Sequence, residues 1–184
     1  MWLIYPSPVG DLFCQLNQKS IERIDFVTTC PLPASERMMP LTESTNPAAQ
    51  WLVERLRAYF LQKDLVLPAS VMGKWLRPQG TFFQKRVWKA CLQVPFGETI
   101  SYGELGERIY GPGTGNSYAR AVGHALHRNP ICILIPCHRV LAQDGKLTGY
   151  AGGLDKKIAL LRHEGVLPDP GLLAEKIPGD RIPS

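Results

Sequence analysis

The chain has 184 residues, of which 45% are hydrophobic and 20% are charged. This is the composition of an ordinary globular protein with one domain or two small ones. No stretch approaches the roughly 20 consecutive apolar residues of a membrane helix. The apolar part of the N-terminal MWLIYPSPVGD is too short for a secretory signal, and no basic region precedes it. We therefore expect a cytoplasmic protein (nuclear if the source is a eukaryote) with no membrane partner.

The net charge of +5 is distributed unevenly along the chain. Residues 1–76 hold seven basic and seven acidic residues, whereas residues 77–165 hold twelve basic and six acidic residues. Residues 166–184 carry a net charge of −1. The whole excess therefore lies in the middle segment, which indicates either a polyanionic partner or simply a basic, well-solvated face.

The five cysteines are odd in number, spread along the chain, and form no CxxC pair. This spacing fits neither a disulfide framework nor a zinc ribbon. A reducing compartment is expected, in which most of the thiols are small buried hydrophobic groups and at least one is chemically active.

The first 76 residues are predicted to form a small α/β domain, a short antiparallel sheet with one helix. Runs rich in strand-forming residues cover Trp2–Tyr5, Asp11–Asn17 and Ile21–Val27, with turn residues between them. A Pro-rich loop over 31–47 leads to a helix over Ala48–Gln62, with Asn46 and Pro47 as its start signal. Nothing in this part indicates chemistry.

Residues 77–165 are predicted to form a mostly helical second domain, so that the fold class is α+β. The stretch GKWLRPQG (73–80) resembles a linker, and a helix is expected over Phe82–Cys91. Ser101 and Glu104 match a capping box, which opens a helix that ends near Tyr110. Residues 166–184 form a C-terminal tail.

A second short helix is expected over Tyr118–Arg128, after the turn GPGTGNS, with Asn116 or Ser117 as its cap. Two short helices joined by a glycine-rich turn suggest a helix-turn-helix, although such pairs also occur in plain helical cores. The small residues of YARAVGHALHR would allow close approach either to another helix or to a nucleic acid. The helix carries few side chains suited to reading bases in the major groove.

The apolar run Ile131–Ile135, a predicted buried strand or extended segment, leads into Pro136-Cys137-His138-Arg139-Val140. A thiol beside an imidazole and a guanidinium is expected to have a low pKa, because positive neighbours favour the thiolate. The alternatives are an inert cysteine and half of a metal site. No second cluster has the spacing of metal ligands, so zinc is not expected.

The string PCHRV, preceded by RAVGHALHRNPICILI and followed by GYAGGL and HEG, resembles the O6-alkylguanine-DNA alkyltransferases. The upstream VPFGETISYGEL fits the same family. The matching blocks cover roughly residues 80–165, and the N-terminal part fits the family's small α/β domain only by size and pattern. The resemblance implies a DNA repair protein that turns over once.

The resemblance implies a catalytic set around the cysteine. Cys137 would take the alkyl group irreversibly from O6 of guanine, and His138 would act through a water as the general base. Glu164 would orient the imidazole, Tyr102 would donate to the N3 edge of the base, and Asn129 would tie the two turns together. Arg139 is interpreted as structural.

It also implies how DNA is bound. Arg120 would replace the flipped nucleotide in the stack, and Ala119, Ala121 and Gly123 would let the helix lie in the minor groove, next to Tyr102. The guanine pocket would be lined by Val140, Tyr150, Ala151 and Leu126. The partner would be double-stranded DNA containing O6-alkylguanine, with no cofactor, no metal, no obligate protein partner, and a monomeric state.

The chain departs from the family's usual pattern in the long turn GPGTGNSY and at Tyr118 and His124. Two other functions stay open on the residues alone. A cysteine hydrolase with Cys137, His138 and Glu164 as its triad would turn over. A DNA-binding regulator would bind in the major groove, and its binding would survive loss of the thiol.

Overall fold

The computed structural model describes residues 1–28, 39–61, 67–147 and 149–168. Cys30, the Pro-rich segment 31–38, the predicted helix end at Gln62 and tail residues 169–184 lie outside these ranges. Among the described residues, no helix combines the length and the apolar character needed to span a bilayer.

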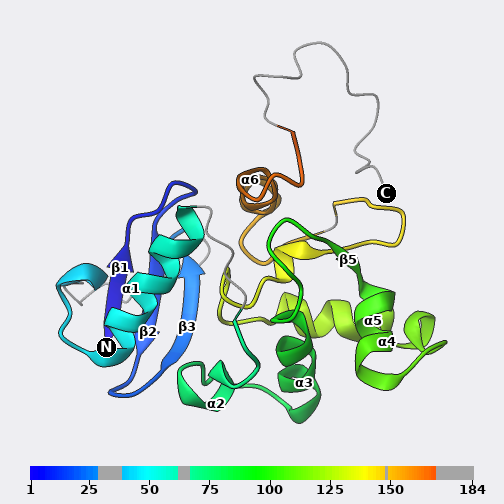
Figure 1. Ribbon diagram of the computed structural model, residues 1–184, viewed down its shortest axis with the longest axis horizontal. Coiled ribbons are helices and arrows are strands. Elements are labelled where there is room, and N and C mark those ends of the chain that lie inside the picture. Colours follow the sequence, from blue (N-terminus) through cyan, green and yellow to red (C-terminus); the bar gives the residue numbers. More distant parts are fainter. Residues whose placement is uncertain (29–38, 62–66, 148, 169–184) are drawn as a thin grey trace.

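The N-terminal part is a four-stranded sheet with one helix packed on it (Figure 1). The strands β1 (Trp2–Tyr5), β2 (Leu12–Leu16), β3 (Ile21–Phe26) and β4 (Met39–Pro40) lie in the order β3-β2-β1-β4. The first three pair antiparallel as predicted, but β4 pairs parallel with β1, so the sheet is mixed. The chain can add this strand because β4 is two residues long and lies at an edge, where Pro40 is tolerated.

The helix α1 (Pro47–Phe60) confirms the predicted helix to within two residues at its end. Asn46 caps it, because the side-chain Oδ1 accepts from the backbone N–H groups of Ala48 and Ala49. One face of α1, which includes Leu52, Leu56 and Tyr59, is fully buried. A short 3-10 turn η1 (Leu41–Glu43) connects the sheet to this helix.

The free edge of β3 is bonded to the C-terminal half of the chain. Ile21 forms a parallel bridge with Leu76, and Ile24 forms one with Ile131. Leu76 is fully buried, so the segment 73–80 predicted as a linker is anchored at this residue. Its first two residues belong to the short turn α2 (Val71–Lys74). The boundary between residues 76 and 77 stays a prediction, but one hydrophobic cluster spans both halves.

The C-terminal half is built on α3 (Phe82–Cys91), α4 (Tyr102–Tyr110) and α5 (Gly115–His127), which pack on one another (Figure 1). Both α3 and α4 begin with capping boxes, at Thr81 with Gln84 and at Ser101 with Glu104, and the second confirms the prediction. The predicted start of α5 is wrong. The helix begins at Gly115 after Thr114, and neither Asn116 nor Ser117 caps it.

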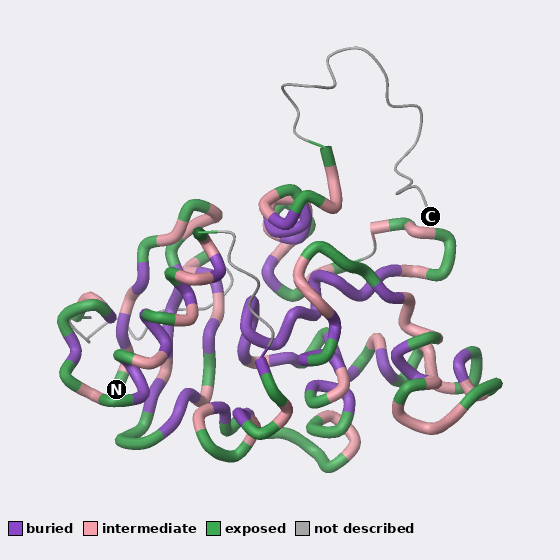
Figure 2. The backbone as a smooth tube through the Cα atoms, in the orientation of Figure 1, coloured by how far each residue is buried: buried purple, intermediate pink, exposed green. Residues whose placement is uncertain are grey.

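The segment from Ile131 to Leu141 is buried without interruption and runs through the middle of the molecule (Figure 2). The predicted extended run over Ile131–Ile135 is wrong beyond Ile131. The chain turns there, and Ile133 adopts a φ of 67°, a conformation that side chains rarely take. This tight turn leads into the 3-10 helix η2 (Cys137–Arg139). The strands β5 (Ile100–Ser101) and β6 (Val140–Leu141) then pair in parallel, and α6 (Leu154–His163) ends at Glu164.

Candidate active site and nucleic-acid interface

Cys137 lies at the start of η2, and only 7% of its surface is exposed. The side chain of Asn129 donates through Nδ2 to the Sγ atom at 3.1 Å and to the Ile135 carbonyl at 2.9 Å, while its Oδ1 accepts from the Ile131 amide at 3.0 Å. One buried amide therefore joins the turn before the cysteine to the cysteine itself.

The low pKa expected for Cys137 is not found in the free protein. Burial raises the pKa of the thiol above its ordinary value, and this outweighs the hydrogen bond from Asn129 and the positive charge of Lys157, both of which lower it. The sequence expectation failed mainly because the sequence does not show how deeply the thiol is buried; in addition, the guanidinium of Arg139 is paired with Glu164. The resting thiol is protonated and needs a base.

His138, the base predicted from the sequence, has a fully buried ring. Its Nε2 lies 2.7 Å from the Glu164 Oε1 atom, and because a carboxylate can only accept, Nε2 carries the proton. The Nδ1 atom is then the lone-pair nitrogen, and among the described residues it has no hydrogen-bond partner. Burial lowers the pKa of His138 and outweighs the opposing effect of Glu164, so the imidazole is neutral and able to accept a proton.

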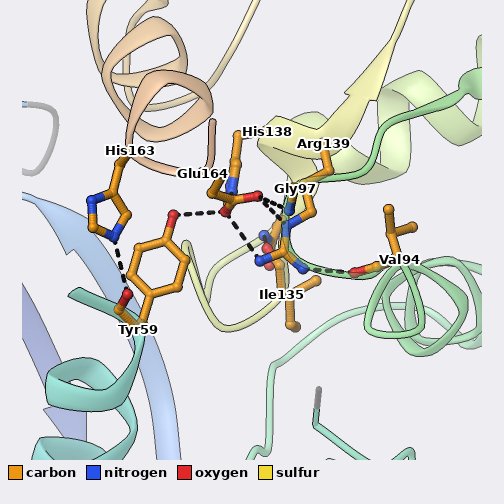
Figure 3. Close-up of polar contacts among 9 residues, drawn as sticks. Tyr59, Val94, Gly97, Ile135, His138, Arg139, His163 and Glu164 are labelled. Atoms are coloured by element: carbon orange, nitrogen blue, oxygen red, sulfur yellow. Dashed lines mark hydrogen bonds and ion pairs between the residues drawn. The ribbon is translucent and has the colours of Figure 1, made fainter. Parts of the chain in front are cut away.

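Glu164 lies at the centre of this network (Figure 3). Besides His138, it accepts from Arg139 Nε at 2.8 Å and Nη2 at 3.0 Å, from the Tyr59 hydroxyl at 2.7 Å, and from the Gly97 amide at 3.2 Å. Burial acts to raise the pKa of Glu164, but the hydrogen bonds from His138 and Arg139 and the charge of the guanidinium outweigh it and lower the pKa to about 2. The carboxylate is therefore ionised, and its donors hold it in one orientation.

Two buried residues near the site were not predicted from the sequence. Tyr59 belongs to α1 in the N-terminal part, where its helical spacing indicates only a core residue. Lys157 is 1% exposed and donates through Nζ to the Val140 carbonyl at 2.9 Å. Burial lowers the pKa of Lys157 to about 8. No local motif around either residue signals its place at the site.

The predicted DNA-contacting residues are grouped away from the thiol. Tyr102, Ala119, Arg120 and Gly123 line one cleft of about 470 Å³ between α5, the start of α4 and the loop after β6. Arg120 is exposed and Tyr102 is half-buried. Ala121 is also exposed but does not line this cleft. The small residues of α5 therefore fall into two groups. Ala119 and Gly123 line the cleft, whereas Gly115 and Ala125 are buried against neighbouring helices.

The residues predicted to line the guanine pocket differ in how deeply they are buried. Val140 is fully buried and Leu126 is 4% exposed, so both belong to the core. The ring of Tyr150 stands edge-on to His138 with centroids 6.4 Å apart. Ala151 is exposed and lines a second hollow, of about 600 Å³, together with Arg128 and Asn129. Asn129 therefore connects this hollow to Cys137.

Comparison with known proteins gives a family model for the C-terminal half and relatives for most of the chain. Residues 82–166 match the family model described as 6-O-methylguanine DNA methyltransferase, DNA binding domain. A methylated-DNA–protein-cysteine methyltransferase of Methanosarcina barkeri is 41% identical over 88% of this chain and 94% of the relative. One from Mycobacterium bovis is 49% identical over 86% of this chain and 88% of the relative.

Solved structures agree in fold. The structure of Mycobacterium tuberculosis OGT in complex with DNA is 38% identical, with a TM-score of 0.69, and the match covers 89% of this chain and 91% of that one. The O6-methylguanine-DNA methyltransferase of Pyrococcus kodakaraensis is 25% identical, with a TM-score of 0.65, over 90% of this chain and 100% of that one. This chain therefore belongs to the methylated-DNA–protein-cysteine methyltransferase family.

Proposed function

We propose that this protein repairs O6-alkylguanine in double-stranded DNA by moving the alkyl group irreversibly onto Cys137. The observation that carries the proposal is the buried set Cys137, His138 and Glu164, in which the imidazole lies 2.7 Å from the carboxylate, in the same half of the chain as the cleft lined by Arg120 and Tyr102. A nucleophile, a neutral base and an orienting carboxylate are the parts that an activated thiol needs.

In the reaction, the thiol proton passes to Nδ1 of His138 through a water, and the sulfur attacks the alkyl carbon. The new S–C bond forms as the C–O6 bond breaks, and the electron pair stays on the guanine. The Tyr102 phenol donates to the N3 edge of the base and so favours its departure. Glu164 stabilises the imidazolium that forms. Because nothing converts the thioether back into a thiol, each molecule reacts once.

The target carbon lies inside a stacked duplex, so the nucleotide must leave the helix, at a cost of a few kcal/mol. Arg120 fills the space that the nucleotide vacates, while Ala119, Ala121 and Gly123 allow α5 to approach the minor groove. Tyr150, Ala151, Val140 and Leu126 form or support the pocket for the base. The free thiols Cys14, Cys91, Cys132 and Cys137 suit a reducing compartment such as the cytoplasm. The proposal includes a monomer with no cofactor and no obligate protein partner.

Intact mass spectrometry after incubation with duplex DNA containing O6-methylguanine tests the proposal. We expect a gain of one methyl group per protein, located on Cys137 and absent from Cys137→Ala. Cys132→Ala is the matched control, since it removes another buried thiol and keeps the proposed nucleophile. An unchanged mass in excess lesion DNA contradicts the proposal. Repeated turnover would instead favour the hydrolase, and DNA binding without any methyl gain would favour the regulator.

A further inference from the structure

A groove of about 740 Å³ lies on the molecule beside α3, where the segment from Met72 to Gln79 faces the exposed side of that helix. Its walls contain four cationic residues, Arg77, Lys85, Arg86 and Lys89, all of which are exposed. No acidic residue lines it. None of the ion pairs found among the described residues involves these four side chains. We call it the α3 groove.

The α3 groove also has apolar surface. The fully buried Leu76 and the half-buried Met72 contribute to its lining, and Phe82 also lines it, with 79% of its surface exposed. Phe82, Lys85, Arg86 and Lys89 are spaced so that they follow one face of the helix. Cationic groups alternating with an exposed aromatic ring suit a ligand that is both anionic and aromatic.

Arg86 is held in place within this surface. Its guanidinium lies over the ring of Tyr110, 4.8 Å from the centroid, and 5.9 Å from that of Phe82. Its Nη2 donates to the Ile109 carbonyl at 3.1 Å. The charge and the Phe82 ring are therefore arranged before any ligand arrives, which reduces the entropy lost on binding.

The α3 groove is continuous with the proposed DNA-binding face. Gln79 lines both the α3 groove and the hollow that contains Arg128, and His127 lines both that hollow and the cleft of Arg120. The three hollows are therefore neighbours, joined at Gln79 and His127, and a nucleic-acid strand that leaves α5 in this direction reaches α3.

We propose that the α3 groove is a second nucleic-acid site, which binds single-stranded nucleic acid. Unpaired bases stack on Phe82, and their phosphates contact Arg77, Lys85 and Lys89. A single strand fits better than a duplex, because the bases of a duplex face inward and would leave the apolar wall and the Phe82 ring uncovered. Base stacking on an aromatic ring combined with a basic groove is the general means of binding single strands.

Fluorescence anisotropy with an oligothymidylate of about eight nucleotides, a length within common site sizes, tests this assignment. We expect Phe82→Ala to weaken binding about tenfold, as loss of one stacked base does. Lys85→Gln with Lys89→Gln should lower the slope of log K against log salt by roughly 0.7 for each charge removed. A duplex of equal length should bind Phe82→Ala and the parent protein equally.

Crosslinking with an oligonucleotide that carries 4-thiothymidine locates the strand, and we expect it on the peptide of residues 75–85. Arg120→Ala is the matched control, because it removes a cation from the α5 face and leaves the α3 groove intact. Crosslinks confined to α5, or oligothymidylate binding that Arg120→Ala abolishes and Phe82→Ala does not change, overturn the proposal. An equal loss with the duplex, or displacement by polyglutamate at equal charge, also overturns it. Methyl transfer to Cys137 from duplex DNA is measured separately and should be unchanged in Phe82→Ala.

Discussion

Glu164 is the residue on which most of the site depends, because one buried carboxylate accepts hydrogen bonds from four residues of three different parts of the chain. Its donors come from α1, from the turn at Gly97, and from η2 (Figure 3). Such a carboxylate holds the imidazole in a single tautomer, and it also couples the geometry of the site to the stability of the fold.

The pKa of Glu164 predicts a specific loss of stability in acid. Its pKa is about 2 when folded and near 4.5 when unfolded, so its stabilisation is complete above pH 4.5 and is lost as the pH falls toward 2. The difference corresponds to about 3 kcal/mol of unfolding free energy. Urea unfolding at a series of pH values measures it. Glu164→Gln, which cannot titrate, should lack this part of the acid dependence, and parallel curves for the two proteins would contradict the assignment.

Tyr59 carries the contribution of the N-terminal part to the site. Burial and the adjacent Glu164 raise the pKa of its hydroxyl, which stays a neutral donor at any physiological pH. Tyr59→Phe keeps the ring and removes one hydrogen bond to a buried charge, so we expect a loss of about 2 kcal/mol in the free energy of unfolding.

Tyr150→Phe is the control for this substitution. Its buried hydroxyl faces the Cys137 thiol, which is a weak acceptor and carries no charge at rest, so removing it should cost less than removing a hydrogen bond to a carboxylate. Both variants are compared with the parent protein by urea denaturation at neutral pH. Equal losses in the two variants would mean that the Tyr59 bond to Glu164 contributes nothing particular.

At the scale of elements, the helix pair α4 and α5 depends on glycines at the crossing. A Cβ atom added at Gly115 would lie 3.0 Å from the Gly103 carbonyl oxygen and 3.1 Å from Glu107 Oε1. Because both helices would have to move apart, we expect Gly115→Ala to destabilise the fold by about 1–3 kcal/mol and to weaken DNA binding.

Substitution of Gly123 tests the proposed DNA contact of the small residues separately from their role in helix packing. A Cβ atom there would meet the Tyr102 ring at 3.7 Å, an ordinary contact. Gly123→Ala should therefore keep or slightly raise the melting temperature, since alanine favours a helix, while it weakens duplex binding. Thermal unfolding and DNA titration of both variants check this. A large drop in stability for Gly123→Ala would contradict this prediction, because it would mean that Gly123, like Gly115, is needed for helix packing.

The same helix pair shows what the sequence could and could not predict. Ser101 and Glu104 predicted the start of α4 because a capping box is a purely local signal. The start of α5 could not be predicted in this way. Gly115 has a poor helix propensity, but its lack of a side chain is what allows the close approach to Gly103, so tertiary packing outweighs local preference.

The residues of the site also divide into those that the sequence predicts and those that only the structure reveals. Cys137, His138 and Glu164 were predicted from adjacent residues and a family resemblance, and the structure places His138 and Glu164 in contact. Tyr59 and Glu164 are 105 residues apart in the sequence. A single aromatic residue in a helix forms no motif that would indicate the hydrogen bond between them. The raised pKa of Cys137 was also unpredictable, because it depends on how deeply the thiol is buried.

At the scale of the whole molecule, the positive charge and the proposed DNA-binding face coincide. Residues 77–165 carry twelve basic and six acidic residues, while residues 1–76 are neutral. The exposed Arg120 and Arg128 lie at α5, where the two hollows of the proposed DNA-binding face meet at His127. We therefore expect binding to undamaged duplex DNA to be dominated by phosphate contacts and to weaken steeply with salt.

Arg128 allows this expectation to be measured one charge at a time. Arg128→Ala should lower the slope of log K against log salt by about 1 and weaken binding to all duplex sequences alike, because it removes one phosphate contact. Lys19→Ala is the matched control, since Lys19 is also exposed but lies in the neutral part, in the turn before β3. Titrations of labelled duplex at a series of salt concentrations give the slopes. An equal reduction of the slope by Lys19→Ala would mean that DNA binding depends only on the net charge of the protein. The location of that charge on the α5 face would then have no role in binding.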